Sequence, residues 1–203
     1  MEEEKKYYEQ HLAEHGFTPK GMGWRDGETQ AKRFQQLATI IKGDNFKIND
    51  LGCGSGDFLS FLNAKIDNPF TYTGYDKLQQ MIEHAAARFN TIGYARFFHI
   101  SDPLEMQMAD YSIASGIFNL KYSSGEEEWL DQIVATIRAM NERSGKGMAF
   151  NLLTKYSDKE FMQDYLYYAD PLFFFDYCKK NFSRNVALLH DYDEYDFTIL
   201  VRK

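Results

Sequence analysis

The segment that most constrains the fold is a short apolar strand that runs directly into a glycine-rich loop and then into a helix. Residues 46–51 have the length of a buried strand, Gly52, Gly54 and Gly56 follow at once, and helical spacing of apolar residues begins at Asp57. This order of strand, tight loop and helix is typical of the first unit of an α/β sheet. The rest of the chain is then expected to supply further parallel strands and the helices that connect them.

The chain that follows repeats the alternation of strand and helix. Strands are predicted at 70–75, 95–100, 110–118 and 147–153, and helices at 57–66, 77–90 and 126–143. Near the end, apolar runs at 186–190 and 197–201 flank the acidic turn 191–196, which predicts an antiparallel hairpin with a solvated tip. We expect an α/β fold with a seven-stranded, mostly parallel sheet, helices on both faces, and this C-terminal hairpin closing the sheet.

No repeat or linker divides the 203 residues, so we expect a single domain over 1–203. The sequence predicts an N-terminal helical segment at 1–42, within which 29–41 has the spacing of a one-sided helix. Aromatic residues make up 16% of the chain, and they gather after the fifth predicted strand. Residues 154–184 are therefore expected to form an aromatic-rich insert or lid.

Charge and composition narrow the range of partners. The net charge is −7 and the 23 Lys and Arg are scattered, whereas a protein that binds nucleic acid normally has a basic stripe. No apolar run reaches the roughly 18 to 20 residues that cross a bilayer, and the start lacks the apolar segment of a signal peptide. Cys53 and Cys178 are too few for a disulfide framework and lack the spacing of metal ligands. We expect a cytoplasmic protein with no nucleic acid, membrane or metal partner.

The glycine loop indicates the kind of ligand, because ligands of open parallel sheets bind at the carboxyl ends of the strands. Glycines at 52, 54 and 56 allow positive φ and let backbone N–H groups approach a ligand closely. A dinucleotide loop has the spacing G-x-G-x-x-G, but here the third glycine comes one residue early and Asp57 takes its place. A carboxylate at that point would repel a pyrophosphate, so the loop suits a ligand without one.

Two aspartates lie at the ends of the next two predicted strands. Asp76 comes 20 residues after Gly56, where a carboxylate can accept both hydroxyl hydrogens of a ribose. Its alternative role is to cap the following helix. Asp102 can contact an adenine amine or can act as a turn residue before Pro103. These features together predict a nucleoside whose tail carries no phosphate.

In this order, the motifs resemble those of the class I S-adenosylmethionine-dependent methyltransferases. The resemblance rests on Asp50-Leu-Gly-Cys-Gly-Ser-Gly56, Asp76, Ser101-Asp102 and the run 109–117, and it covers roughly residues 40–153. It implies a Rossmann-like fold, transferase activity and S-adenosyl-L-methionine as cofactor. It also implies these roles: Asp50, Gly52, Cys53, Gly54 and Gly56 at the methionine end, Asp76 at the ribose, Asp102 at the adenine, Lys77 and Ser101 in the same cofactor site, and Ser115, Gly116 and Ile117 beside the sulfonium and the acceptor.

The acceptor site is expected in the parts that vary most in this superfamily, the N-terminal segment and the insert. Trp24, Tyr167 and Tyr168 are the predicted acceptor-binding residues, in an aromatic-walled pocket to which Tyr7, Tyr8 and Tyr165 are also candidates. The alternative is that these rings pack onto the sheet. Arg33, which shares a helix face with Gln30, is predicted to reach the methionine carboxylate.

The sequence favours methyl transfer to a small molecule. Transfer from a sulfonium is an in-line displacement, in which positioning of the acceptor lone pair is the main requirement. No histidine is a convincing base, so no catalytic residue is assigned. Superfamily members that methylate nucleobase amines carry Asn-Pro-Pro-Tyr after the fourth strand, where this chain has Ile117-Phe-Asn-Leu120. The alternatives are a nucleotide-dependent oxidoreductase and a non-catalytic S-adenosylmethionine-binding protein that acts through a partner.

Overall fold

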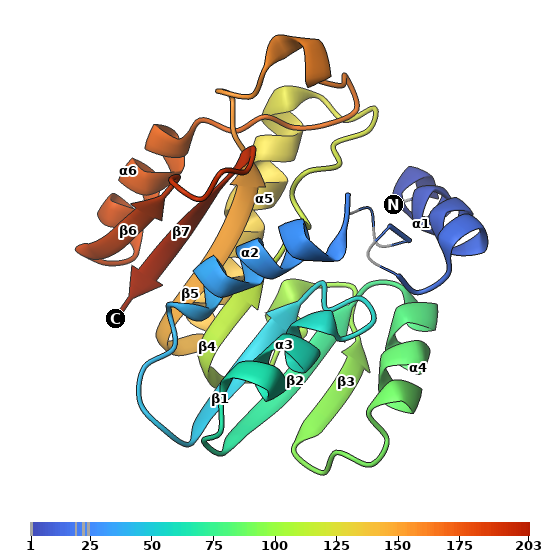
Figure 1. The fold of residues 1–203 in the computed structure, drawn as a ribbon. Helices are drawn as coiled ribbons and strands as arrows, with labels where there is room; N and C mark the ends of the chain where they lie inside the picture. Colours follow the sequence, from blue (N-terminus) through green and yellow to red (C-terminus); the bar gives the residue numbers. More distant parts are fainter. Residues whose placement is uncertain (1, 19, 22, 24) are drawn as a thin grey trace.

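A seven-stranded sheet with the order β3-β2-β1-β4-β5-β7-β6 forms the centre of the computed structural model (Figure 1). The structure describes residues 2–18, 20, 21, 23 and 25–203, so the predicted acceptor residue Trp24 lies outside the described residues. Pairing is parallel between β1, β2, β3, β4 and β5, whereas β7 runs antiparallel to both β5 and β6. The predicted mostly parallel sheet with a closing hairpin is confirmed.

The strands lie close to their predicted positions. They are β1 (Phe46–Leu51), β2 (Phe70–Asp76), β3 (Ala95–His99), β4 (Ala109–Ala114), β5 (Ser144–Leu153), β6 (Asn185–Leu189) and β7 (Asp196–Arg202). The largest difference is at β4, which was expected to continue to Phe118 but ends at Ala114. Gly116 has φ +75° there, and its N–H donates to Asn151 Oδ1 at 2.8 Å, so the chain turns instead of extending.

Helices precede, connect and follow these strands. They are α1 (Glu2–His15), α2 (Gly27–Ala38), α3 (Asp57–Lys65), α4 (Gln79–Arg88), α5 (Glu126–Glu142) and α6 (Pro171–Asn181), with 3₁₀ turns η1 (Pro103–Glu105) and η2 (Lys159–Phe161). Two aspartates fix helix starts: Asp26 accepts the Thr29 N–H at 2.8 Å before α2, and Asp170 accepts the Leu172 N–H at 3.0 Å before α6. Among the described residues, no helix combines the length and the apolar character needed to span a bilayer.

Helices cover both faces of the sheet, as predicted. On one face, Phe34 and Leu37 of α2 pack with Phe58 and Leu62 of α3 over β1. The other face carries α5 and α6. Their apolar side chains form a second hydrophobic core with the strands, which includes Ile133, Ile137, Met140, Phe174 and Cys178 of the helices and Phe150, Phe197 and Ile199 of the strands. Figure 1 shows α2 and α3 in front of the strands and α5 behind them. The carboxyl ends of β1, β2 and β4 lie at a cavity that residues of α2, α3 and α5 also line.

The insert after β5 divides its aromatic residues between the core and the surface of a cavity. Phe174 lies in the core, with its ring centroid 6.2 Å from that of Phe150 and 6.3 Å from that of Phe197. Ahead of α6, the insert pairs with the loop after β4, because the N–H groups of Lys121 and Tyr122 both donate to the Tyr165 carbonyl at 3.0 Å. This pairing holds Tyr165 beside the ends of the central strands.

The acidic turn between β6 and β7 differs from the prediction of a solvated tip. Asp191 and Asp193 are exposed, but the Glu194 side chain is only 5% exposed and that of Asp196, the first residue of β7, is fully buried. The reason is Arg33 on α2, whose guanidinium contacts both carboxylates. The expectation was therefore wrong for the second half of the turn, because the counter-charge comes from a helix far away in the sequence.

Candidate functional site

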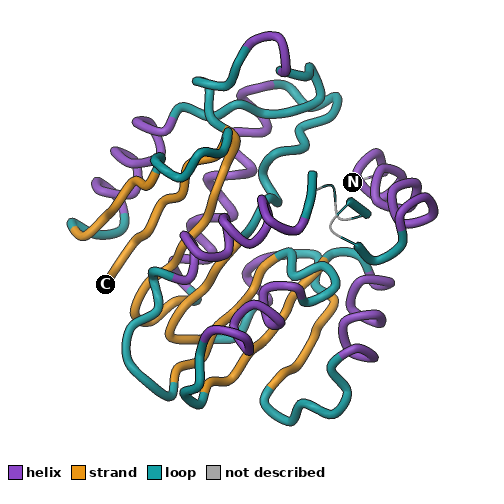
Figure 2. The backbone as a smooth tube through the Cα atoms, in the orientation of Figure 1, coloured by secondary structure: helices purple, strands orange, loops and turns teal. Residues whose placement is uncertain are grey.

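A cavity of about 430 Å³ lies at the carboxyl ends of β1, β2 and β4. The glycine loop, the start of α4, the loop after β4, the cavity-facing side of α2, Tyr165 and the β6–β7 turn all contribute to its lining. Figure 2 shows the loops after these strands at one edge of the sheet, between the strands and α1. Its volume falls in the range of about 300–1,000 Å³ that is usual for small-molecule and cofactor sites. This edge is also where open α/β sheets bind ligands.

The glycine loop owes its shape to close backbone approach. Gly52 has φ +74°, and a Cβ there would lie 2.1 Å from Ile117 Cγ2. Gly56 has φ +80°, and a Cβ there would lie 2.6 Å from Phe89 Cε2. The N–H groups of Gly52 and Cys53 donate to the Tyr75 carbonyl at 2.8 and 3.0 Å, which fixes the loop against β2. Any side chain at 52 or 56 would push the loop away from its neighbours.

Cys53, the residue between the first two glycines, is a packing residue in this loop. Its thiol is buried, and burial, with Asp76 and Asp50 nearby, raises its pKa well above the usual value. The thiol therefore stays protonated at neutral pH and is a poor nucleophile. This agrees with its predicted role as a small residue lining the loop.

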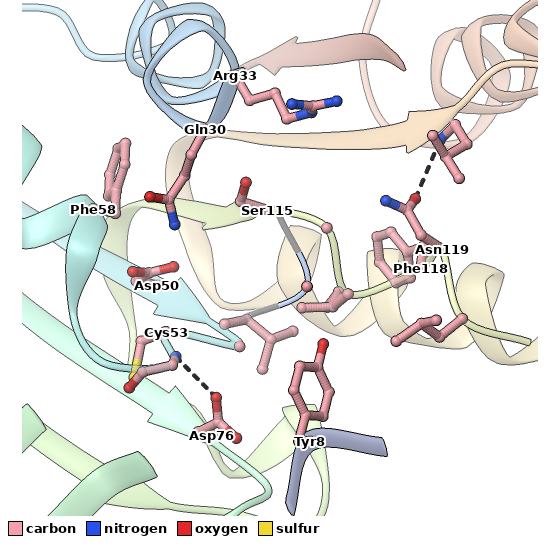
Figure 3. Close-up of a pocket in the computed structure, with 18 of the residues that line it drawn as sticks. Tyr8, Gln30, Arg33, Asp50, Cys53, Phe58, Asp76, Ser115, Phe118 and Asn119 are labelled. Atoms are coloured by element: carbon pink, nitrogen blue, oxygen red, sulfur yellow. Dashed lines mark hydrogen bonds between the residues drawn. The ribbon is translucent and has the colours of Figure 1, made fainter. Parts of the chain in front are cut away.

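Asp50 is a buried carboxyl group at the floor of the cavity, 2% exposed and bonded by the Tyr72 hydroxyl. Desolvation raises its pKa to about 7, the hydrogen bond from Tyr72 opposes that shift, and the carboxylates of Asp76 and Asp57 add to it. Figure 3 shows Gln30 pointing from α2 toward Asp50, between Phe58 and Ser115. The sequence did not identify Tyr72, whose partner is set by the pairing of β1 with β2.

Asp76 links the glycine loop to the start of α4. Its Oδ2 accepts the Gly54 N–H at 2.9 Å, the bond drawn at Asp76 in Figure 3, and its Oδ1 accepts the Leu78 N–H at 2.9 Å. Both residues after it, Lys77 and Leu78, also line the cavity. The N-cap residue of α4 is Leu78, so Asp76 does not have the helix-capping role considered from the sequence, and its carboxylate lies at the cavity wall.

Ser101 and Asp102 are not brought to the cavity. Asp102 accepts the Leu104 N–H at 2.8 Å and forms a capping box with Glu105, so it serves the turn role weighed against adenine binding. The Ser101 N–H donates to the Glu105 carboxylate at 3.0 Å. From this turn, Pro103 is the residue that lines the cavity.

The loop after β4 lies beside the glycine loop and forms another part of the cavity wall. Ser115, Gly116 and Ile117 all line the cavity as predicted, and Ser115 Oγ is buried with no hydrogen-bond partner among the described residues. Asn119 Oδ1 accepts the Leu153 N–H at 3.2 Å, and Trp129 Nε1 donates to the Phe118 carbonyl at 2.9 Å. These bonds hold the loop in place and put the Trp129 side chain at the cavity.

Arg33 lines the cavity, but its guanidinium is already engaged. Nε donates to Asp196 Oδ2 at 2.8 Å, Nη1 donates to the Thr29 carbonyl at 2.9 Å, and Nη2 contacts Glu194 Oε2 at 3.5 Å. In Figure 3 its guanidinium lies further from Asp50 than the Gln30 amide does. Gln30 is thus the nearer of the two predicted helix contacts to the cavity floor.

The aromatic lining differs from the predicted acceptor residues. Tyr7, Tyr8, Trp129, Tyr165 and Tyr195 line the cavity. Tyr167 is 7% exposed and belongs to the α5–α6 core, and the Tyr168 hydroxyl accepts the Gln163 N–H at 2.9 Å away from the cavity lining. Trp129 of α5 and Tyr195 of the β6–β7 turn were not identified as cavity residues, because local spacing does not predict which distant elements meet at the cavity. Within the described part of the chain, no group of three or more His, Cys, Asp or Glu side chains is placed to hold a metal.

Comparison with known proteins identifies the family. A protein of Mycobacterium tuberculosis named "Putative methyltransferase Rv1506c" is 49% identical over 167 residues, which cover 82% of this chain and 99% of that protein. The chain belongs to the class I S-adenosylmethionine-dependent methyltransferases. A family model described as "Methyltransferase domain" also matches residues 48–145 of this methyltransferase, which run from within β1 to the start of β5.

Solved structures share the fold of this methyltransferase at low identity. Magnesium protoporphyrin IX methyltransferase from Synechocystis PCC 6803, crystallised with bound SAH, superposes with a TM-score of 0.63 at 16% identity, over 87% of this chain and 83% of that chain. Human N-acetylserotonin methyltransferase, in complex with SAM, gives a TM-score of 0.62 at 13% identity, over 84% of this chain and 51% of that chain. The family's cofactor is S-adenosylmethionine, and the Rossmann-like fold is the one predicted.

Proposed function

We propose that this methyltransferase binds S-adenosylmethionine in the 430 Å³ cavity and transfers the methyl group to a small-molecule acceptor by in-line displacement. The observation that carries the proposal is the meeting of the glycine loop, Asp50 and Asp76 in one cavity at the carboxyl ends of the strands. The arrangement offers a loop backbone that a ligand can approach closely, the buried carboxyl group of Asp50 and the carboxylate of Asp76 at the cavity wall. A nucleoside with an amino-acid tail uses all three.

Three features of the cavity fit the cofactor. Gly52 has a positive φ and no room for a Cβ, so only glycine fits at this position. The absence of a side chain there lets a ligand approach the backbone closely. Asp50 is a carboxyl group that a neighbouring ammonium would favour in its ionised form. Ser115 Oγ, buried without a hydrogen-bond partner among the described residues, is a donor and acceptor that a ligand can satisfy. We assign Asp50, Gly52, Cys53, Gly54 and Gly56 to the methionine end and Asp76 to the ribose.

The walls suit the reaction that this family performs. When bound, S-adenosylmethionine supplies an electrophilic methyl group on a positively charged sulfur. The chain's task is to hold the acceptor in line with that methyl and to exclude water. The rings of Tyr8, Phe118 and Tyr165 at the cavity supply apolar surface for both tasks, and aromatic faces attract a sulfonium cation. A base is needed only where the acceptor must lose its proton early, so no side chain is assigned that role.

An oxidoreductase that uses a dinucleotide is disfavoured by Asp57. Its carboxylate stands at the start of α3, where the pyrophosphate of a dinucleotide would approach the helix. Arg88 Nη1 donates to Asp57 Oδ1 at 2.6 Å and the Ser55 hydroxyl donates to Oδ2 at 3.0 Å, so the carboxylate is fixed in the loop. A diphosphate would have to displace these donors and lie beside a negative charge.

A methyl-transfer assay tests the proposed function. The protein is incubated with methyl-labelled S-adenosylmethionine and a metabolite extract, and label is counted separately in the small-molecule, protein and nucleic-acid fractions. We expect label in the small-molecule fraction, at least tenfold less with Asp76→Asn, and no change with Asp67→Asn, which alters an exposed carboxylate outside the cavity lining. Label confined to a macromolecular fraction contradicts the acceptor class. Cofactor binding without labelled product in any fraction indicates the non-catalytic alternative.

A further inference from the structure

Glu194 is a buried carboxylate at the cavity with unused hydrogen-bonding capacity. Its side chain is 5% exposed and lines the cavity, and Oε1 has no hydrogen-bond donor among the described residues. Three cations surround it at longer range: Lys32 Nζ is 3.4 Å and Arg25 Nη2 is 4.0 Å from Oε1, and Arg33 Nη2 is 3.5 Å from Oε2. Its charge is therefore compensated, although one oxygen still lacks a close donor.

Glu194 lies at the end of the cavity away from the predicted ribose site. Asp76 ends β2 and Glu194 precedes β7, and in the sheet order β1, β4 and β5 lie between those two strands. The turn that carries Glu194 is at the same edge as the carboxyl ends of β1 and β4, since both ends of the cavity share one lining. A cofactor whose nucleoside lies at Asp76 and whose amino-acid tail lies at Asp50, on the neighbouring strands β2 and β1, leaves the Glu194 end to the second substrate.

The charges at this end leave little room for a charged acceptor. Arg33 faces both Asp196 and Glu194, and Arg25 donates to Asp26 at 3.1 Å, so neither cation lacks a counter-charge for an anion to replace. The charge of Glu194 is already compensated by Lys32, Arg25 and Arg33, so the positive charge of an ammonium group on the acceptor would have no counter-charge here. Because a charge without a counter-charge is costly to bury, an acceptor without net charge fits best.

We propose that Glu194 determines acceptor specificity, by accepting at Oε1 a hydrogen bond from a hydroxyl or neutral N–H group of an uncharged acceptor. The proposal rests on the methyltransferase function assigned above to the cavity. Tyr165, Tyr195 and Trp129 line the same cavity, so the body of the acceptor is aromatic or otherwise apolar. The Tyr195 hydroxyl donates to Asp158, which leaves Glu194 as the group of the β6–β7 turn that is available to the acceptor.

Three probes that share one ring test this selectivity: benzyl alcohol, benzoate and benzylammonium. Their dissociation constants are measured by ligand-observed NMR with the protein saturated with S-adenosylhomocysteine. We expect the wild type to bind benzyl alcohol at least fivefold more tightly than either ion. Glu194→Gln should lower the affinity for benzyl alcohol about tenfold, because a hydrogen bond to a charged carboxylate is lost. It should raise the affinity for benzoate, because Arg33 and Lys32 lose a counter-charge.

Lys32→Gln is the complementary variant. Lys32 does not line the cavity and its side chain is 38% exposed, so the change alters the charge around Glu194 without altering the wall. We expect benzylammonium to gain affinity in this variant. Glu142→Gln, at the exposed end of α5, is the matched control and should leave the order of the three probes unchanged. Equal binding of benzoate and benzyl alcohol to the wild type, or an unchanged order in Glu194→Gln, overturns the proposal.

Calorimetry with S-adenosylhomocysteine separates failure of this proposal from failure of the proposed function. If the wild type does not bind S-adenosylhomocysteine, the methyltransferase assignment of the cavity itself fails. If the wild type and Glu194→Gln bind it equally and the probe order is unchanged, only the role of Glu194 is wrong. Equal affinity for S-adenosylhomocysteine in the variant also shows that it is folded, so a changed probe order then reports on Glu194.

Discussion

The two ends of the cavity are built by different means. At the end proposed to bind the cofactor, called the nucleoside end here, a backbone loop and two strand-end aspartates come from residues 50–78, and their contacts are between neighbouring strands. At the Glu194 end, Arg33 of α2 bonds Asp196, which is 163 residues further along the chain. The first end therefore depends on conformation and the second on side-chain contacts between distant elements. Substitutions should separate the two: glycine changes damage the first end, and charge changes damage the second.

The largest effect is expected from Arg33→Gln at the Glu194 end. Asp196 is fully buried, so loss of Arg33 leaves an uncompensated carboxylate, which costs about 3–5 kcal/mol of unfolding free energy at neutral pH. Urea denaturation followed by circular dichroism measures this. Asp196→Asn added to the variant should restore part of the loss. Lys180→Gln removes an exposed i,i+4 ion pair with Asp176 and should cost less than about 1 kcal/mol; a similar cost for both single variants would contradict the account.

Gly52→Ala is expected to have the next largest effect, at the nucleoside end. Its Cβ would lie 2.1 Å from Ile117 Cγ2 at φ +74°, whereas Gly43 has φ +75° with nothing within 4 Å of a Cβ. Gly43→Ala should therefore cost only the positive-φ strain, about 1–2 kcal/mol. Gly52→Ala should lower the unfolding free energy by more than that, as measured by thermal denaturation. It should also lower the affinity for S-adenosylhomocysteine at least tenfold, as measured by calorimetry. Equal stability losses, with binding intact in both, would show that close approach at Gly52 is unimportant.

The pH dependence of cofactor binding tests Asp50. Its pKa is raised to about 7 in the free protein, mainly by desolvation, so the carboxyl group gains a proton as the pH falls through 7. An ammonium group bound beside it requires the ionised form, so affinity for S-adenosylhomocysteine should fall about tenfold between pH 8 and pH 6. Asp50→Asn should bind more weakly and with a flatter profile. A flat profile in the wild type would remove Asp50 from the methionine end.

The same group makes a prediction for stability without ligand. Because the folded-state pKa lies above the unfolded value of 3.8, the contribution of Asp50 to stability is complete below pH 3.8 and is lost as the pH rises through about 7. Asp50→Asn should therefore be less sensitive to pH than the wild type in unfolding experiments between pH 5 and pH 8. An identical pH dependence in both proteins would contradict the raised pKa.

The smallest effect is expected from Tyr168→Phe. The Tyr168 hydroxyl accepts a backbone N–H outside the cavity lining, so its loss should change benzyl alcohol affinity less than twofold. Tyr165→Ala removes a ring that lines the cavity and should weaken the same probe several-fold. Ligand-observed NMR compares the two variants directly. The reverse order would place the acceptor at Tyr168, as the sequence predicted, and not at Tyr165.

Local signals predicted the sheet and the placement of the glycine loop, Asp50 and Asp76 at its edge, for physical reasons. Strand, glycine loop and helix follow one another directly, so the positions of Gly52, Asp50 and Asp76 depend on short stretches whose conformation the residues themselves determine. Asp102 shows the limit of this reasoning, because a turn-capping aspartate and a ligand-binding one have the same sequence signal. In the structure Asp102 caps η1, and its contact with adenine stays a prediction.

The Glu194 end was not predictable in the same way. Glu194 and Asp196 belong to an acidic run that is typical of a solvated turn, and only the packing of α2 against β7 supplies Arg33 as their partner. Trp129 reaches the cavity because its indole bonds the Phe118 carbonyl across a loop of irregular structure. Tyr167, three residues from the helix cap Asp170, was drawn into the core instead. Contacts between residues so far apart in the sequence produce no regular spacing that a sequence pattern could reveal.

Calorimetric titration of the protein with S-adenosylmethionine, S-adenosylhomocysteine and NAD tests the central claim most directly. We expect both sulfur nucleosides to bind and NAD not to bind. Asp76→Asn should weaken both sulfur nucleosides at least tenfold, and Asp67→Asn should leave them unchanged. Binding of NAD without binding of either sulfur nucleoside, or full affinity in Asp76→Asn, would contradict the assignment of this cavity.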